Sequence, residues 1–149
     1  MKLEEEIKQV KFENEKQKAI LNIIYTANWI SSIQHKIFKK NKLTSPQYNV
    51  LRILRGKSPD PLTVSSIQER MLDKMSNASR LVDKLVEKGL AERSTCLYDR
   101  RQVDVVITEK GLKLLKHMEP ALSDFHNNTM VLNEKDAQLV NSALDKIRG

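Results

Sequence analysis

The chain is poor in cysteine, glycine, proline and aromatic residues, and each shortage excludes a class of protein. Its one cysteine, Cys96, excludes an intrachain disulfide and a cysteine-rich metal cluster. Four glycines and four prolines in 149 residues favour a helix-rich fold over a β-sandwich or a barrel. Aromatic residues make up 5% of the chain, so its core has to be built mainly from Leu, Ile and Val.

Long apolar runs and catalytic patterns are also missing. No apolar run approaches the roughly 20 residues that cross a bilayer, and residues 1–15 are dense in Lys and Glu, unlike a signal peptide. We therefore expect a cytoplasmic protein. The three histidines lie far apart, and no Gly-rich phosphate loop, HExxH or GxSxG pattern occurs. We expect neither an enzyme nor a bound cofactor or metal.

The formal net charge of +7 favours an acidic partner, nucleic acid first, although a basic solvated surface would give the same value. Residues 36–57 contain seven Lys and Arg and no acidic residue. Residues 70–110 contain nine Lys and Arg against seven Asp and Glu, an excess of two. Because this excess is small, any recognition of nucleic acid by residues 70–110 depends on where their charges lie. The basic stretch at 36–57 either flanks a DNA backbone or is a solvated surface.

Apolar residues at helical spacing predict a series of amphipathic helices. The first covers about residues 17–38, and its wide apolar stripe indicates contact with more than one neighbour. Residues 1–15 are expected to fray. Further helices are predicted to begin at Thr44-Ser45-Pro46, Thr63, Ser76, Thr108 and Asn133. Gly56 and Gly89 are predicted to end the helices before them.

A β-hairpin is predicted directly after Gly89. Residues 90–93 form its first strand, and Val103, Val105 and Ile107 alternate with other side chains in its second strand. The loop between the strands carries Asp99-Arg100-Arg101. Two short helices joined by a tight turn, followed by a charged hairpin, are typical of a winged helix.

Taken in order, these motifs resemble those of the MarR family of bacterial transcription regulators. They are Leu43-Thr44-Ser45-Pro46-Gln47, Ser79-Arg80-Leu81-Val82-Asp83-Lys84-Leu85, Lys88-Gly89-Leu90, Asp99-Arg100-Arg101 and Ile107-Thr108-Glu109-Lys110-Gly111. The resemblance implies a mainly α fold with a small β-hairpin wing, in which N- and C-terminal dimerisation helices flank a winged helix-turn-helix. It implies one domain over 1–149, with a DNA-binding lobe at about 43–111 and a helical dimerisation region at 5–40 and 109–149.

The start of the helix after Ser76 is the predicted reading surface. A recognition helix reads the major groove through its N-terminal residues. Those residues here are Ser76, Asn77, Ser79 and Arg80. Asn can pair with adenine and Arg with guanine, both bidentately. Lys74 and Lys84 are predicted phosphate contacts. The alternative for all these side chains is a solvated helix face.

The charged triplet in the hairpin loop is predicted to contact the minor groove. An arginine at a hairpin tip can enter a narrow minor groove, where the negative potential is enhanced. By resemblance, Arg101 is the minor-groove probe, Asp99 its orienting partner and Arg100 a second contact. A carboxylate two residues away can hold a guanidinium in place. The alternative is a charged turn on an edge hairpin.

The resemblance also implies a homodimer that binds double-stranded DNA at a near-palindromic operator, with its reading helices roughly 34 Å apart. It implies a repressor that responds to a small phenolic or anionic effector, or to an oxidant. Candidate effector contacts are Tyr25, Trp29, His35 and Arg52; the alternatives are core packing for Trp29 and an exposed polar side chain for His35. Cys96 has no resolving cysteine, which favours a simple thiol. The alternative function is a winged-helix adaptor that binds another protein and lacks a ligand response.

Overall fold

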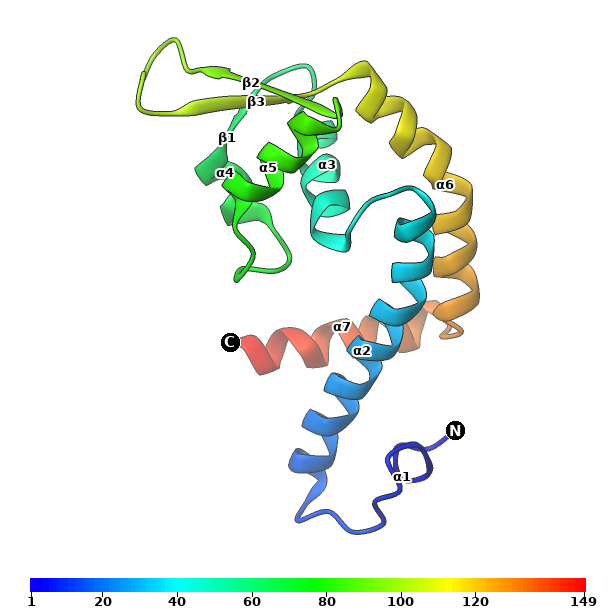
Figure 1. Cartoon of the computed structure of the whole chain (residues 1–149). Helices are drawn as coiled ribbons and strands as arrows, with labels where there is room; N and C mark the ends of the chain where they lie inside the picture. Colours follow the sequence, from blue (N-terminus) through cyan, green and yellow to red (C-terminus); the bar gives the residue numbers. More distant parts are fainter. The chain divides into compact units, whose positions relative to one another are not determined.

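A computed structural model describes residues 1–149, with seven helices and three short strands (Figure 1). The elements are α1 (Leu3–Glu6), α2 (Glu15–Lys40), α3 (Ser45–Lys57), β1 (Leu62–Thr63), α4 (Val64–Arg70), α5 (Ala78–Glu87), β2 (Ala91–Thr95), β3 (Val103–Ile107), α6 (Glu109–Thr129) and α7 (Glu134–Arg148). The chain divides into two compact units, residues 1–117 and 118–149, and α6 spans the boundary. None of the helices combines the length and apolar character needed to cross a bilayer. The predicted fold class is confirmed.

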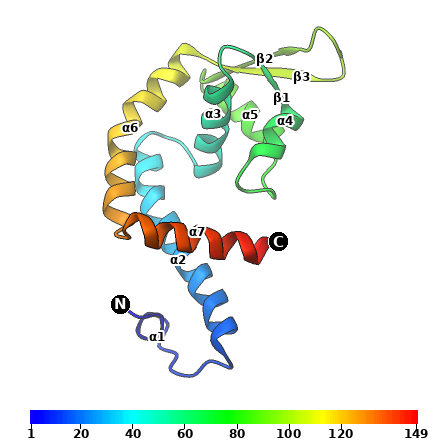
Figure 2. The ribbon, with the colours of Figure 1, turned by 180° about the vertical axis from the view of Figure 1, so that it is seen from behind.

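The core of the first unit lies where α3, α4 and α5 pack against one another and against the sheet (Figures 1 and 2). Helices α3 and α5 each bury residues spaced three or four apart, which places them on one face, and α4 buries Ile67. The fully buried apolar side chains include Val50, Leu51, Leu54, Ile67, Val82 and Leu85. This packing fixes the start of α5 relative to the sheet.

The three strands form an antiparallel sheet in the order β1-β3-β2. Val105, the centre of β3, pairs with Leu62 on one side and with Arg93 on the other. The sequence predicted only the hairpin of β2 and β3. It missed β1, because two residues after a proline are too few to show an alternating pattern. Since β3 is held on both sides, the hairpin is anchored in the lobe at its base.

The glycines behave differently from one another. Gly89, with φ 70°, ends α5 as predicted, because a residue without Cβ adopts this left-handed conformation at little cost. The predicted helix end at Gly56 is wrong. Helix α3 continues to Lys57, and Gly56 is not among the residues with positive φ.

The prediction that residues 1–15 fray is wrong in its first half. Leu3 of α1 is buried, and the Glu4 carboxylate lies 2.5 Å from the Lys18 ammonium of α2. The Tyr25 hydroxyl donates to Glu6 over 2.6 Å. The acidic side chains of this segment thus have partners on α2. The sequence pattern alone does not show these contacts, so the segment was expected to be solvated and frayed.

Candidate nucleic-acid interface

The first turn of α5 is capped by Asn77. Its Oδ1 accepts a hydrogen bond from the Arg80 backbone N–H at 3.1 Å. The prediction that Ser76 caps this helix is wrong. The Ser76 hydroxyl instead donates to the Asp73 carboxylate over 2.6 Å, and its side chain is half-buried. The cap therefore uses the Oδ1 acceptor of Asn77 and not its Nδ2 donor, an arrangement that suits an acceptor on a base edge better than the expected bidentate pair with adenine.

The turn between α4 and α5 is held by two polar side chains. Asp73 accepts from the Ser76 hydroxyl and from the Met75 backbone N–H. These hydrogen bonds, the first of them above all, lower the pKa of the Asp73 carboxyl. Gln68 of α4 donates to the Ser76 carbonyl over 2.8 Å and accepts from the Ala78 N–H over 2.9 Å. Sequence reasoning missed Gln68, because a cap supplied from a neighbouring helix leaves no local pattern.

One of the predicted reading side chains of α5, Ser79, lies beside the loop end of the hairpin. Asn77, Ser79 and Arg80 are exposed. Ser79 and Arg101 line one surface groove of about 300 Å³, together with Thr63, Val64, Ser65, Gln102 and Val103. The fold thus brings together one residue of the predicted helix site and one of the predicted hairpin site. The stretch Thr63–Ser65 was missed as part of this surface.

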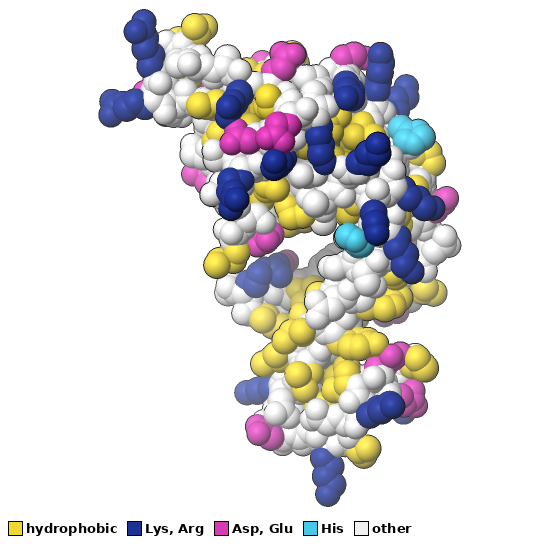
Figure 3. Space-filling model, in the orientation of Figure 1, with side chains coloured by type: hydrophobic (Ala, Val, Ile, Leu, Met, Phe, Trp, Pro, Cys, Tyr) yellow, Lys and Arg dark blue, Asp and Glu magenta, His cyan; other side chains and the backbone are white.

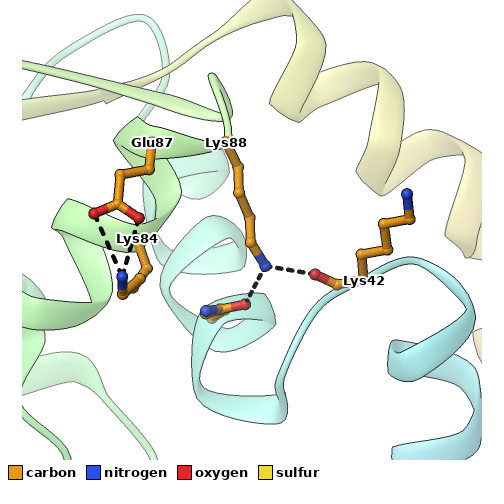
Figure 4. A network of polar contacts seen from close by, with 5 residues as sticks. Lys42, Lys84, Glu87 and Lys88 are labelled. Carbon is orange, nitrogen blue, oxygen red and sulfur yellow. Dashed lines mark hydrogen bonds and ion pairs between the residues drawn. The ribbon is translucent and has the colours of Figure 1, made fainter.

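The two lysines predicted to contact phosphates already have partners. The Lys84 ammonium lies 3.0 Å from the Glu87 carboxylate, and both side chains are more than half exposed (Figure 4). The Lys74 ammonium donates to the carbonyl of Glu69. A phosphate would have to replace these internal contacts, and exposed pairs of this kind are weak.

The hairpin loop is shaped by Asp99. Its Oδ1 accepts from the Arg101 backbone N–H at 3.0 Å, and its Oδ2 accepts from the Gln102 side chain at 3.2 Å. The Cys96 N–H donates to the Gln102 carbonyl and closes the loop. The Arg101 guanidinium lies 3.7 Å from Asp99, and its side chain is 96% exposed. Asp99 therefore holds the backbone that carries Arg101 more than it holds the guanidinium.

Lys88, directly after α5, links this helix to the rest of the lobe (Figure 4). Its ammonium donates to the Lys42 carbonyl at 2.5 Å and to Gln47 Oε1 at 3.0 Å. The Lys110 ammonium of α6 donates to the Lys88 carbonyl at 2.9 Å. Lys42 has φ 55°, so the α2–α3 loop turns sharply at the residue whose carbonyl accepts the hydrogen bond from Lys88. No local sequence pattern predicts these contacts, because each joins residues more than 20 apart.

Basic side chains are spread over this surface. Figure 3 shows dark-blue Lys and Arg side chains at the hairpin tip and across the face that carries α5, with acidic side chains between them. On α5, the Asp83 carboxylate pairs with Arg93 of β2. Positive and negative side chains thus alternate on this surface, which agrees with the near balance of charges in residues 70–110.

Comparison with known proteins identifies the family. A sequence profile of the MarR family matches residues 43–103, which span α3 to the start of β3. The crystal structure of a MarR transcription factor from Planctomyces limnophilus is 30% identical, with a TM-score of 0.69, and the match covers 92% of this chain and 95% of that one. The chain belongs to the MarR family.

Two further relatives agree with this membership. The HTH-type transcriptional regulator MhqR of Bacillus subtilis is 29% identical over 119 residues, which cover 79% of this chain and 81% of MhqR. A MarR family regulator from Streptomyces coelicolor, solved in complex with DNA, is 16% identical with a TM-score of 0.79, and the match covers 93% of this chain and 89% of that one. The latter likeness concerns the fold. The resemblance to the MarR family that the sequence motifs indicated is therefore confirmed.

The four candidate effector residues of this MarR family protein do not lie together. Tyr25 and Trp29 line one pocket of about 370 Å³, beside α1 residues that include Leu3 and Glu6. His35 is exposed farther along α2, and Arg52 donates to the Tyr48 hydroxyl on α3. Trp29 is 45% exposed, so it is not part of the core of the single chain. The hydrogen bond to Glu6, and secondarily burial, raise the pKa of Tyr25.

Proposed function

We propose that the protein is a cytoplasmic, sequence-specific regulator that binds double-stranded DNA as a homodimer and represses transcription from a near-palindromic operator. The observation that carries this proposal is the groove shared by Ser79 of α5 and Arg101 of the hairpin. A reading helix and a wing that meet at one surface suit simultaneous contact with a major groove and the adjacent minor groove. The Streptomyces coelicolor relative of the same fold, solved with DNA, supports this use of the fold.

Within this proposal, the two parts of the surface have different tasks. Ser76, Asn77, Ser79 and Arg80 face the bases of the major groove, with Lys74 and Lys84 beside the phosphates. Arg101, shaped by the Asp99 loop, reads the minor groove, and Arg100 adds a second contact. No catalytic role is proposed, because the family and the relatives compared are regulators.

The proposed dimer rests on apolar side chains that the chain leaves in contact with water. Figure 3 shows hydrophobic side chains clustered along α2. The exposed apolar residues of α2 and α7 include Ile20, Ile24, Trp29, Leu139, Val140 and Ile147. A twofold dimer needs a self-complementary patch, and exposed apolar patches mark such surfaces. We assign residues 43–111 to the DNA-binding lobe, and 5–40 and 109–149 to the dimerisation region.

The proposed effector site is the pocket at Tyr25 and Trp29. Glu6 is the only charged side chain among its lining residues, so a neutral phenolic compound suits it better than an anion. Trp29 is the only tryptophan of the chain, and its fluorescence reports on this pocket. We expect phenol to quench Trp29 at lower concentration than benzoate does. Equal and weak quenching by both would contradict an effector site here.

The decisive experiment measures binding to mixed duplex DNA at two salt concentrations. Binding that neutralises phosphates weakens steeply with salt, because condensed counterions are released. Selection from a random duplex pool should then return a near-palindrome. Absence of retention at low salt would remove the regulator proposal and favour the protein-binding adaptor.

Two substitutions test the division of labour between wing and helix. Arg101→Ala should weaken binding at the half-site flanks and lower the slope of log K against log salt by about 1. Asn77→Ser keeps a capping oxygen but removes the Nδ2 donor, so it should relax base preference within the half-site by about 5- to 100-fold while leaving stability nearly unchanged. Equal and sequence-blind losses from both variants would contradict the assignment.

A further inference from the structure

Two large apolar side chains stand fully exposed at the tip of the hairpin. Leu97 is 93% and Tyr98 is 99% exposed. They follow Cys96, whose N–H pairs with Gln102 and closes the loop. Met1, Val10, Leu72, Met75 and Val131 are exposed to a similar degree, but only Leu97 and Tyr98 are neighbours in the sequence. An apolar pair left this bare in a charged loop indicates a surface that is covered by a partner.

The backbone around this pair is held in place. Asp99, the next residue, accepts hydrogen bonds from the Arg101 backbone and the Gln102 side chain. The positions of Leu97 and Tyr98 are therefore tied to those of the two exposed arginines. Figures 1 and 2 show the hairpin loop projecting beyond the helices of the lobe, so its tip is free to enter a groove ahead of them.

We propose that Leu97 and Tyr98 form an apolar wedge that enters the DNA minor groove beside Arg101 and partly unstacks a base step flanking the half-site. The proposal rests on the proposed DNA-binding function. Minor-groove proteins insert apolar side chains between base steps, while neighbouring cations contact the phosphates and the groove floor. Arg100 and Arg101 supply those cations in the same loop, which favours DNA as the occupant over an apolar protein surface.

This wedge has two consequences that differ from those of the arginines. An apolar contact releases no condensed counterions, so it adds affinity without adding to the salt dependence. Pyrimidine–purine steps unstack most easily, so the wedge should favour such a step at the flank of the half-site. The wing would then contribute specificity through deformation of the DNA as well as through charge.

The test compares the wild type with two double variants on the duplex that the wild type selects from a random pool. Leu97→Ser/Tyr98→Ser should raise Kd about tenfold with an unchanged salt slope, because it removes apolar contact and no charge. Leu97→Met/Tyr98→Phe should stay within about twofold of the wild type, because it keeps the apolar volume.

A fluorescent base reports on the wedge directly. With 2-aminopurine at the flanking step, fluorescence should rise on binding of the wild type and the Met/Phe variant, and not with the double-serine variant. The wedge is refuted if the double-serine variant matches the wild type in Kd, if its salt slope falls, or if 2-aminopurine gives no rise. Failure of the proposed function looks different: the wild type itself would then show no salt-dependent retention on DNA.

Discussion

Replacing Lys88 by methionine should destabilise the lobe, whereas the same change at Lys84 should not. The Lys88 ammonium bridges the Lys42 carbonyl and the buried Gln47 side chain, which is 7% exposed. The Lys84 ammonium has only the exposed Glu87 as partner. Methionine keeps most of the aliphatic stem in both variants, so the comparison isolates the two ammonium groups.

The magnitude follows from what each change leaves behind. A hydrogen bond to a charged group contributes about 1.5–3 kcal/mol, and Lys88 makes two. That sum is an upper bound, because Gln47 Oε1 keeps its bond from the Thr44 N–H and water can solvate the Lys42 carbonyl. We expect a net loss of about 1–2 kcal/mol, or about 4 °C in Tm. Lys84→Met should lose about 0–0.5 kcal/mol, as expected for a surface pair.

Urea unfolding followed by circular dichroism, at one fixed protein concentration, measures both losses, since dimerisation would make stability depend on concentration. DNA binding should show the opposite order. Lys84→Met should lower the salt slope by about 1 if Lys84 contacts a phosphate, and Lys88→Met should leave the slope unchanged. Equal losses of stability in the two variants would refute the bridging role of Lys88.

Two further predictions concern stability. Gly111→Ala should destabilise by about 1–3 kcal/mol, because its Cβ would lie 2.4 Å from the Leu90 carbonyl oxygen; Gly56→Ala, which meets nothing within 4 Å, should instead stabilise by about 0.5–1 kcal/mol, and thermal unfolding distinguishes the two signs. The Asp73 carboxyl has a lowered pKa, so its stabilising contribution is present above the ordinary carboxyl pKa and is lost as the pH falls through the lowered value. The stability difference between wild type and Asp73→Asn, measured by urea unfolding, should therefore shrink on acidification, and a difference that grows would contradict this.

The fold was largely predictable because its core depends on repeated, local patterns. Apolar residues at helical spacing located the long helices, and Thr63 and Asn133 cap α4 and α7 as predicted. What the sequence missed depends on contacts between distant residues. Strand β1 forms because β3 offers it an edge, and α1 is held by side chains of α2.

The candidate site shows the same limit at the level of single atoms. Residue types identified Asn77 and Lys84 as potential DNA contacts, but they do not reveal that Asn77 Oδ1 is already used by the helix cap and that Lys84 is paired with Glu87. Ser76 and Asn77 are both good capping residues. The nearby Asp73 carboxylate engages the Ser76 hydroxyl, so the cap falls to Asn77. A sequence motif thus identifies candidate residues, whereas the folded structure shows which of their side-chain atoms are still available for a contact with DNA.

The cap at Asn77 has a consequence for retargeting the protein to new DNA sequences. In a library randomised at this position, most variants should lose helix stability before any effect on DNA binding can be measured. The reason is that only Asn, Asp, Ser, Thr and Gly cap a helix well. Variation there should return the same few residues whatever duplex is offered. Ser79 and Arg80 use no side-chain atom to hold the helix, so new preferences should emerge from those two positions.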